Sequence, residues 1–331
     1  MSASFGKSIV VTLFGESHAK YIGATIDGLP ANIEIDHNFI TSQLAKRRGK
    51  GNLTTSRIEN DEYEFISGAK NGKTNGNPLT VLIKNENYND EEYPLDLARP
   101  SHGDYTNYLV NKENGERIGG GYYSGRLTAP IVVLGAIAIS VLKNKNITIT
   151  SKIDDKTIEL VKEAKDNNDS LGAKVITVVK NFIPGVGGAF FDTLEGNLAN
   201  AIFAIPGVKG VSFGLGFDYE LSLGSKVNDE FALKDDKIAF TSNNCGGING
   251  GYSNGDDIVI NTVFKPTPSI GKMQKCLDLK TKKVIDYQIN GRHDACIAIR
   301  GQVVVDSVVA LVLIDALKNK YGEEFLKWNT D

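Results

Sequence analysis

The sequence contains few of the residues that build disulfide frameworks or metal sites. Three cysteines, Cys245, Cys276 and Cys296, stand among 331 residues and form no CxxC pair. An odd number of widely spaced cysteines supplies neither a disulfide framework nor a zinc site, and is typical of reduced thiols in a cytoplasm. The four histidines are far apart and the HExxH pattern is absent. We therefore expect no metal site.

A membrane-spanning segment and an excess of one charge are also missing. The most apolar stretch, Leu127–Leu142, is interrupted by Pro130 and Gly135. It is shorter than the ~18–20 residues that a membrane span needs, which favours a buried core helix. The N-terminus has no apolar signal core, and the net charge of −3 gives no dominant basic face. We expect no membrane partner, no nucleic-acid partner and a cytoplasmic location.

Two common nucleotide-binding motifs are absent, although two other patterns suit an anion. The loop 119–126 (GGGYYSGR) leads into the apolar helix, but it lacks the Gly-Lys-Ser/Thr ending of a Walker loop, and the chain lacks a GxGxxG fingerprint. A glycine-rich loop before a helix presents free N–H groups to an anion. The segment 265–269 (KPTPS) offers donors on a stiff turn that suits a phosphate or a flavin edge. A tight turn that binds no ligand would show the same two sequence patterns.

Arginine is the scarce cation: only eight of the 37 Lys and Arg residues are Arg. The planar guanidinium matches carboxylate and phosphate oxygens bidentately, which a lysine cannot do. Arg117 and Arg99 are interpreted as surface residues. The other six lie in glycine-, Ser/Thr- or His-containing stretches and predict a small anionic ligand with phosphate, carboxylate or both; they are Arg47, Arg48, Arg57, Arg126, Arg292 and Arg300.

Three of the four histidines lie in short polar segments that make poor cores. His18 ends Gly-Glu-Ser-His, His102 ends Arg-Pro-Ser-His, and His293 lies in Gly-Arg-His-Asp. Such residues are as compatible with one shared pocket as with separate, satisfied polar positions. His37 follows Asp36 at a predicted helix start and is interpreted as surface.

Hydrophobic periodicity predicts a mixture of strands and helices without a linker between domains. We therefore expect a single domain over residues 1–331. Gly125-Arg126 and Gly291-Arg292 each precede an apolar helix that ends Leu-Lys-Asn-Lys, a weak sign of two related halves. The predicted strands are Ser8–Leu13, Glu62–Ile66, Leu79–Ile83, Lys174–Val179, Val208–Phe213 and Ile258–Phe264. The predicted helices are Asp36–Lys46, Leu127–Leu142, Lys156–Ala164, Leu194–Ala204 and Val303–Lys320.

Taken in order, these segments resemble the chorismate synthases over nearly the whole chain. The matching motifs are Phe14-Gly15-Glu16-Ser17-His18, Arg47-Arg48 to Arg57, Arg99-Pro100-Ser101-His102-Gly103-Asp104-Tyr105, Gly119–Arg126, Asp169-Ser170-Leu171-Gly172, Ser242–Ile248, Lys265–Ser269 and Gly291–Asp294. The resemblance implies an α+β fold, a β-α-β sandwich of two antiparallel sheets with helices between and around them and an internal pseudo-twofold axis.

The resemblance also implies an activity. The family converts 5-enolpyruvylshikimate-3-phosphate (EPSP) to chorismate and phosphate by a 1,4-anti elimination, as a carbon–oxygen lyase of aromatic amino-acid synthesis. Its cofactor is reduced FMN, its members are homotetramers, and NADP is associated with the supply of the reductant. The chain has no inserted reductase region, so we expect an external source of reduced flavin.

By the same resemblance, catalytic roles fall on matching positions. His18 would protonate or bond the departing phosphate, and Ser17 would order the water beside it. His102 would act near flavin N1, and Asp294 would act at flavin N5 as the base that completes deprotonation. Substrate anions would be bound by Arg47, Arg48, Arg126 and Arg292. FMN would contact Tyr122, Tyr123, Ser124, Gly250, Lys265, Pro266, Thr267, Pro268, Ser269 and Arg292, with Ser124 also counted as catalytic.

The chain departs from the family pattern at four places. Ala19 stands where Gly is common, Asn52 where Arg is common, and Tyr122-Tyr123-Ser124 where Arg-Ser-Ser is common. Pro206-Gly207 replaces a pair that often contacts the flavin, so that contact is not assigned to this chain. Two other classes of function remain open. A His/Asp-assisted phosphohydrolase would release phosphate without flavin or a new double bond, and a non-catalytic flavin- or anion-binding protein would show no turnover.

Overall fold

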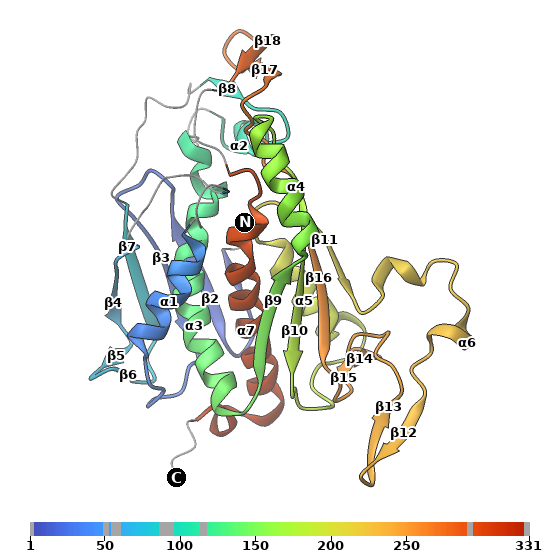
Figure 1. The fold of residues 1–331 in the computed structure, drawn as a ribbon. Helices are drawn as coiled ribbons and strands as arrows, with labels where there is room; N and C mark the ends of the chain where they lie inside the picture. The colour runs from blue at the N-terminus through green and yellow to red at the C-terminus, as the bar shows by residue number, and fades with distance from the viewer. Residues whose placement is uncertain are drawn as a thin grey trace.

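Two antiparallel sheets enclose a pair of long helices (Figure 1). This computed structural model describes residues 3–48, 53, 61–85, 96–112, 118–289 and 294–327. The first sheet has the order β1-β2-β3-β7-β4, formed by Ser4–Phe5, Val10–Gly15, Tyr21–Asp27, Leu79–Lys84 and Tyr63–Ser67. The second has the order β11-β16-β10-β9, formed by Val208–Phe213, Ile258–Phe264, Ala173–Lys180 and Thr148–Ile153.

The central helices are α3 (Thr128–Asn144) and α7 (Ala298–Tyr321). Both are apolar around most of their circumference because each is covered by a sheet and by the other helix. They approach closely where Gly135 faces Ser307: a Cβ on Gly135 would lie 2.2 Å from the Cβ of Ser307. The 20-residue stretch Gly125–Asn144 is apolar and long enough to cross a membrane, but 83% of its most apolar window is buried inside the protein. The prediction of a core helix is confirmed.

The two halves of the chain repeat one topology. The first half runs β2, β3, α1 (His37–Arg47), β4, β7 and α3, and the second runs β9, β10, α5 (Leu194–Phe203), β11, β16 and α7. Within the sheets these strands stand in the matching orders β2-β3-β7-β4 and β9-β10-β16-β11. The shared Leu-Lys-Asn-Lys endings of the central helices therefore mark equivalent positions, as a pseudo-twofold relation requires.

Smaller elements decorate this core. They are α2 (Asp104–Asn111), α4 (Asp155–Asp166), α6 (Gly224–Val227), β5 (Ala69–Lys70), β6 (Lys73–Thr74), β8 (Leu97–Ala98), β12 (Phe231–Lys234), β13 (Lys237–Phe240), β14 (Ile248–Asn249), β15 (Tyr252–Ser253), β17 (Met273–Asp278) and β18 (Lys283–Gln288). Single turns of 3-10 helix at Ile118–Tyr123 (η4) and Gly125–Leu127 (η5) lead into α3. A segment containing α6, β12 and β13 projects away from the second sheet (Figure 1).

All six predicted strands and five predicted helices are present, with β11 and β16 at their predicted bounds. Asp36 caps α1 through a 2.9 Å bond from the amide of Phe39, as expected of an N-cap aspartate. Three strands of the two sheets were not predicted: β1, β3 and β9. The strand β9 lies at a sheet edge with Thr148, Thr150 and Lys152 exposed, so its apolar signal is short.

One buried carboxyl makes the stability of this core depend on pH. Asp306 of α7 is largely buried and accepts a hydrogen bond from Ser151 of β9. Burial raises the pKa of Asp306 to about 6, against the smaller lowering effects of the Ser151 bond and the Lys46 charge. Between pH 4 and pH 6 the folded chain therefore keeps this proton, whereas the unfolded chain has released it. The contribution of protonated Asp306 to folding stability is present at pH 4 and is lost as the pH rises through about 6.

We expect Asp306→Asn to remove this dependence. Because the amide never ionises, the variant should gain stability relative to the wild type between pH 4 and pH 7, by up to about 3 kcal/mol. Urea unfolding at both pH values measures the difference, with exposed Asp166→Asn on α4 as the matched control. An unchanged difference between wild type and variant across this range would show that Asp306 titrates normally.

Candidate functional site

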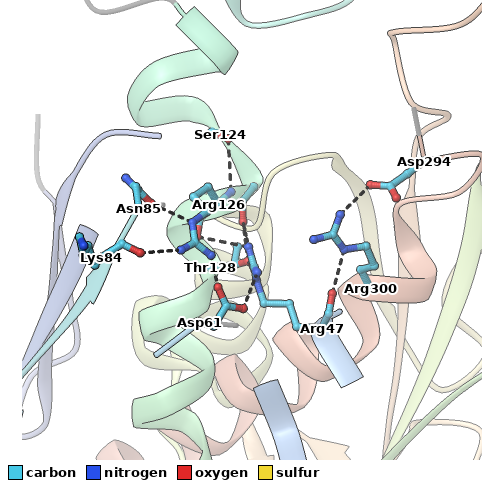
Figure 2. Close-up of polar contacts among 10 residues, drawn as sticks. Arg47, Asp61, Lys84, Asn85, Ser124, Arg126, Thr128, Asp294 and Arg300 are labelled. Carbon is cyan, nitrogen blue, oxygen red and sulfur yellow. Dashed lines mark hydrogen bonds and ion pairs between the residues drawn. The ribbon is translucent and has the colours of Figure 1, made fainter. Parts of the chain in front are cut away.

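Polar residues gather where the two central helices begin, and a shared carboxylate lies at their centre (Figure 2). Asp61 Oδ2 accepts a hydrogen bond from Arg47 Nη1 at 3.2 Å, and Asp61 Oδ1 accepts one from Arg126 Nη1. The Asp61 side chain is 1% exposed, and the two arginine side chains are 6% and 9% exposed. Two guanidinium groups thus converge on one buried carboxylate, and such a concentration of positive charge favours an anion nearby.

Arg47 ends α1 and holds the glycine-rich loop in place. Its Nε donates to Thr128 Oγ1 at 3.1 Å, and its Nη2 donates to the carbonyl oxygens of Gly125 and Arg126 at 3.2 and 3.3 Å. Thr128 in turn donates to the carbonyl of Gly125 at 2.6 Å. The guanidinium therefore fixes the turn into α3, in addition to any contact that it makes with a ligand.

Arg126 connects this centre to the loop that carries His18. Its Nε donates to Asn85 Oδ1 at 2.9 Å, and Asn85 Nδ2 donates to the carbonyl of Ala19 at 2.6 Å. The amide of Ser17 donates to the carbonyl of Gly121 at 3.2 Å, which joins the same loop to η4. The departure at Ala19 leaves this arrangement intact because the contact uses its backbone.

The His18 loop depends on a glycine where β2 ends. Gly15 has φ +94°, and a Cβ there would lie 2.5 Å from the carbonyl oxygen of Tyr21 and 2.7 Å from Cα of Ile22. The following Ser17 is buried, and its Oγ lies 3.1 Å from Nδ1 of the half-buried His18. The structure thus brings Ser17, His18, Arg126 and the glycine-rich loop together.

A second cluster surrounds His102. Its Nδ1 lies 2.7 Å from Asp104 Oδ1, and Arg99 binds the same carboxylate through Nε and Nη2 at 2.7 and 2.9 Å. Burial alone would raise the pKa of Asp104, but the hydrogen bonds and charges of Arg99 and His102 hold it well below its usual range. Arg99 Nη1 also donates to Ser269 Oγ at 3.2 Å, so this cluster reaches the segment 265–269.

The segment 265–269 is tied to this cluster at both ends. Lys265 Nζ donates to the carbonyl of Ser101, and burial together with the charge of Lys209 lowers the pKa of Lys265. Ser170 Oγ donates to the carbonyl of Thr267 at 2.8 Å, so the predicted motif 169–172 packs on this segment. The hydroxyl of Thr267 is buried and has no hydrogen-bond partner among the described residues, as expected of a group that meets a ligand.

A third cluster lies at the start of α7. Asp294 Oδ2 accepts a bond from Arg300 Nη1 at 3.1 Å, and Arg300 Nε donates to the carbonyl of Arg47 at 2.8 Å (Figure 2). Asp294 is therefore joined to the arginine centre through the backbone of Arg47. The predicted site residue Arg292, together with His293, Asn52 and Arg57, lies outside the described residues.

Other predicted site residues lie at different distances from these clusters. Tyr122 and Tyr123 of η4 are 39% and 37% exposed, and their rings meet edge to face at a centroid distance of 6.3 Å. Gly250 lies in the turn between β14 and β15, near the start of β16, whereas segment 265–269 follows its end. A seven-residue strand spans roughly 20 Å, so one chain does not bring Gly250 beside that segment. Arg48 directly follows α1.

Sequence reasoning missed several residues of the site. Arg99 is not an incidental surface residue: its side chain is 10% exposed and grips Asp104. Arg99 lies three residues before His102, and Asp104 lies two residues after it. This spacing is a signal in the sequence that could have predicted the Arg99–Asp104 ion pair. Asp61 and Asn85 are single polar residues in unremarkable segments and gave no such signal. Within the described ranges no group of three or more His, Cys, Asp or Glu side chains could hold a metal ion.

The fold is an α+β sandwich built from two related halves, and its polar groups gather where the central helices begin. A crystal structure of a chorismate synthase shares this fold with a TM-score of 0.76, covering 97% of this chain and 96% of that chain at 24% identity. The chorismate synthase family model matches residues 9–156 and 151–317, two ranges that meet shortly after the first half ends.

Curated sequences agree. The chain is 40% identical to the chorismate synthase of Methanobrevibacter smithii over 350 residues, covering 95% of this chain and 96% of the relative. It is 41% identical to that of Campylobacter fetus subsp. fetus over 344 residues, covering 95% of each. The chain belongs to the chorismate synthase family, an enzyme family of the shikimate pathway and aromatic amino-acid biosynthesis, and the resemblance inferred from its motifs is confirmed.

Proposed function

We propose that this protein converts EPSP to chorismate and inorganic phosphate by a 1,4-anti elimination that needs reduced FMN. The observation that carries the proposal is that three clusters contact residues at the start of the two central helices. The His18 loop bonds Gly121, the ring of His102 lies against Gly120, and Arg300 joins Asp294 to the backbone of Arg47. In the reaction the C3–O bond breaks, phosphate leaves with its electron pair, and a hydrogen leaves C6 while the new double bond forms. No net oxidation occurs.

The anionic substrate is bound by arginine. Arg126 and Arg47 place two guanidinium groups beside the carboxylate of Asp61, and Arg48 and Arg292 are the further residues assigned to the substrate anions. As phosphate departs, negative charge grows on its oxygens, and cations and donors fixed in advance stabilise that charge. His18 donates a proton or hydrogen bond to the leaving phosphate, and Ser17, 3.1 Å from its Nδ1, orders the ring and the adjacent water.

The residues present fit a flavin. The buried hydroxyl of Thr267 has no hydrogen-bond partner among the described residues and could bond a ligand. The half-exposed rings of Tyr122 and Tyr123 offer an aromatic face on the glycine-rich loop. Tyr122, Tyr123, Ser124, Gly250, Arg292 and residues 265–269 are assigned to hold FMN. Reduced flavin would supply electron density to the elimination when bound. His102 would hold a proton beside the bound flavin, and Asp294 would be the base that finally accepts the proton lost from C6.

The arrangement of one chain favours an assembly. The projecting segment exposes large apolar side chains, among them Phe217, Leu221, Phe231 and Ile238, with exposed fractions between 77% and 97%. Surfaces of this kind are typical of protein–protein contacts. An assembly also accounts for the separation of Gly250 from segment 265–269, because one copy can supply Gly250 and another copy the segment. We propose a homotetramer of one-domain subunits in the cytoplasm, supplied with reduced flavin by an external reductant.

Turnover should require reduced flavin without consuming it. EPSP incubated anaerobically with the protein and photoreduced FMN should give chorismate, followed by its absorbance, with one phosphate per chorismate. Omitting FMN should abolish both products. Phosphate release without FMN and without chorismate would identify a phosphohydrolase instead, and flavin binding without turnover would identify a binding protein.

A further inference from the structure

The carboxylate of Asp104 binds two residues that precede it in the sequence, Arg99 and His102. Its Oδ1 lies 2.7 Å from Nδ1 of His102, while its Oδ2 accepts the backbone amide of Arg99 at 3.1 Å and its Nε–H at 2.7 Å. Oδ1 also accepts Arg99 Nη2 at 2.9 Å, which makes the arginine bidentate. The Asp104 side chain is 6% exposed. A buried carboxylate with this many donors has one orientation available.

The local backbone creates this arrangement. Asp104 is the first residue of α2, where the helix dipole favours a negative charge. Ser101 has a positive φ of 57°, an unusual conformation for serine, and it turns the chain so that residues 99 and 104 can meet. The segment 99–104 thereby closes on its own carboxylate.

The contacts define which ring nitrogen of His102 carries the proton. A carboxylate oxygen can only accept, so the 2.7 Å contact with Asp104 requires an N–H on Nδ1. Arg99 Nη2 lies 3.0 Å from the same nitrogen, and one of its two N–H groups is directed at Asp104 Oδ1. In the opposite tautomer Nδ1 would accept from Arg99, and its lone pair would face the Asp104 carboxylate at 2.7 Å. Repulsion makes this second arrangement the poorer one.

The other edge of the ring is then left for chemistry. A Cβ on Gly120 would lie 3.4 Å from Cε1 of His102 and 3.8 Å from Nε2, so this edge faces the glycine-rich loop η4. In the neutral ring Nε2 carries the lone pair and can accept a proton, and in the charged ring it can donate one.

We propose that Asp104 is a positioning residue that holds His102 with its Nδ1–H on the carboxylate and its Nε2 toward the glycine-rich loop, and that Arg99 locks Asp104 in this orientation. The catalytic part of the proposal rests on the proposed function, but the tautomer does not. Through its 3.2 Å bond to Ser269 Oγ, Arg99 also ties the ring to the segment assigned to FMN. The lowered pKa of Asp104 keeps its carboxylate ionised at neutral and mildly acidic pH.

The tautomer can be observed directly in the wild-type protein. Solid-state ¹⁵N spectra of histidine-labelled protein, at a pH where the ring is neutral, distinguish a protonated nitrogen from an unprotonated one, and His102→Gln assigns the signal. We expect His102 to be protonated at Nδ1. A ring protonated at Nε2 would mean that Arg99 donates to Nδ1, and would overturn the proposal whether or not EPSP is the substrate.

Asp104→Asn should reverse the tautomer. An amide has one acceptor and one donor side; because Arg99 only donates, the amide oxygen turns to Arg99 and the NH₂ group turns to His102. Nδ1 must then accept, which moves the proton to Nε2. We expect the FMN affinity of the folded variant to stay near the wild-type value, while single-turnover chorismate formation falls by about 10²–10⁴.

Two further variants complete the test. Asp286→Asn removes an exposed carboxylate that pairs with Lys275 and should change neither the spectrum nor the rate. Arg99→Lys loses the bidentate grip and should give mixed tautomers with an intermediate rate. Retention of the Nδ1–H signal and of the rate in Asp104→Asn would refute the positioning role. A wild type with the expected tautomer that makes no chorismate would refute the proposed function alone.

Discussion

Asp294→Asn is expected to abolish most catalysis while leaving the binding of FMN and EPSP close to the wild-type level. The change keeps the shape of the side chain and removes the basic carboxylate. Loss of a positioned base lowers a rate by about 10²–10⁴, or roughly 3–5 kcal/mol in barrier height. Single-turnover chorismate formation and FMN affinity, measured on the same preparation, give the two quantities.

A purely structural role for Asp294 makes a different forecast. Its carboxylate accepts from Arg300 Nη1 at 3.1 Å, and Arg300 supports the end of α1 through the carbonyl of Arg47. If this contact were the whole function of Asp294, Arg300→Gln would lower the rate as much as Asp294→Asn does, and flavin affinity would fall with it. A wild-type rate in Asp294→Asn would remove the residue from the mechanism.

Asp61→Asn is expected to have the largest effect on folding stability. The amide leaves Arg47 and Arg126 buried without a negative charge between them, and breaking such a pair costs about 3–5 kcal/mol. Because the deficit is one of charge, sulfate or phosphate should restore part of the stability by occupying the same space. Urea unfolding with and without about 50 mM of either anion measures both effects. This concentration is chosen to exceed the Kd of a weak anion site.

The matched control is Asp192→Asn, which removes an exposed carboxylate paired with Lys7. Pairs of this kind contribute about 0–1 kcal/mol, and added anions should not rescue the variant beyond their effect on the wild type. A loss in Asp61→Asn no larger than in this control would show that water compensates the two arginines. Rescue by chloride as strong as by phosphate would point to general screening rather than a bound oxyanion.

The sequence predicted the core well because the physical signals there are local. Strands β10 and β16 contain alternating or continuous apolar residues, and α3 and α7 are long apolar runs. Hydrophobic periodicity alone is therefore enough to predict these elements. Strand β3 contains Gly23 and Ala24, which carry little strand propensity, and its pairing with β2 and β7 makes it a strand nonetheless. Tertiary contacts decide such a segment.

The site was predictable only where its residues occur together in the sequence. Ser17 with His18 could be read as one motif, and the structure does place them together. Asp61 and Asn85 act through partners far along the chain, Arg126 above all. Their importance depends on burial and on the meeting of separate elements, which a pattern of neighbouring residues does not express.

The repeated topology has a consequence for the contact between the two central helices. Aligning the two helix endings, Leu142 with Leu317, pairs Gly135 with Ala310 and Val132 with Ser307. A twofold relation between the halves pairs the contact of Gly135 with Ser307 with the equivalent positions Ala310 and Val132, which is the reciprocal pattern of an isologous dimer interface. The chain is in this sense arranged like a dimer within one polypeptide. Its two halves carry different residues at equivalent positions, so that a symmetric frame holds a site with two unlike sides.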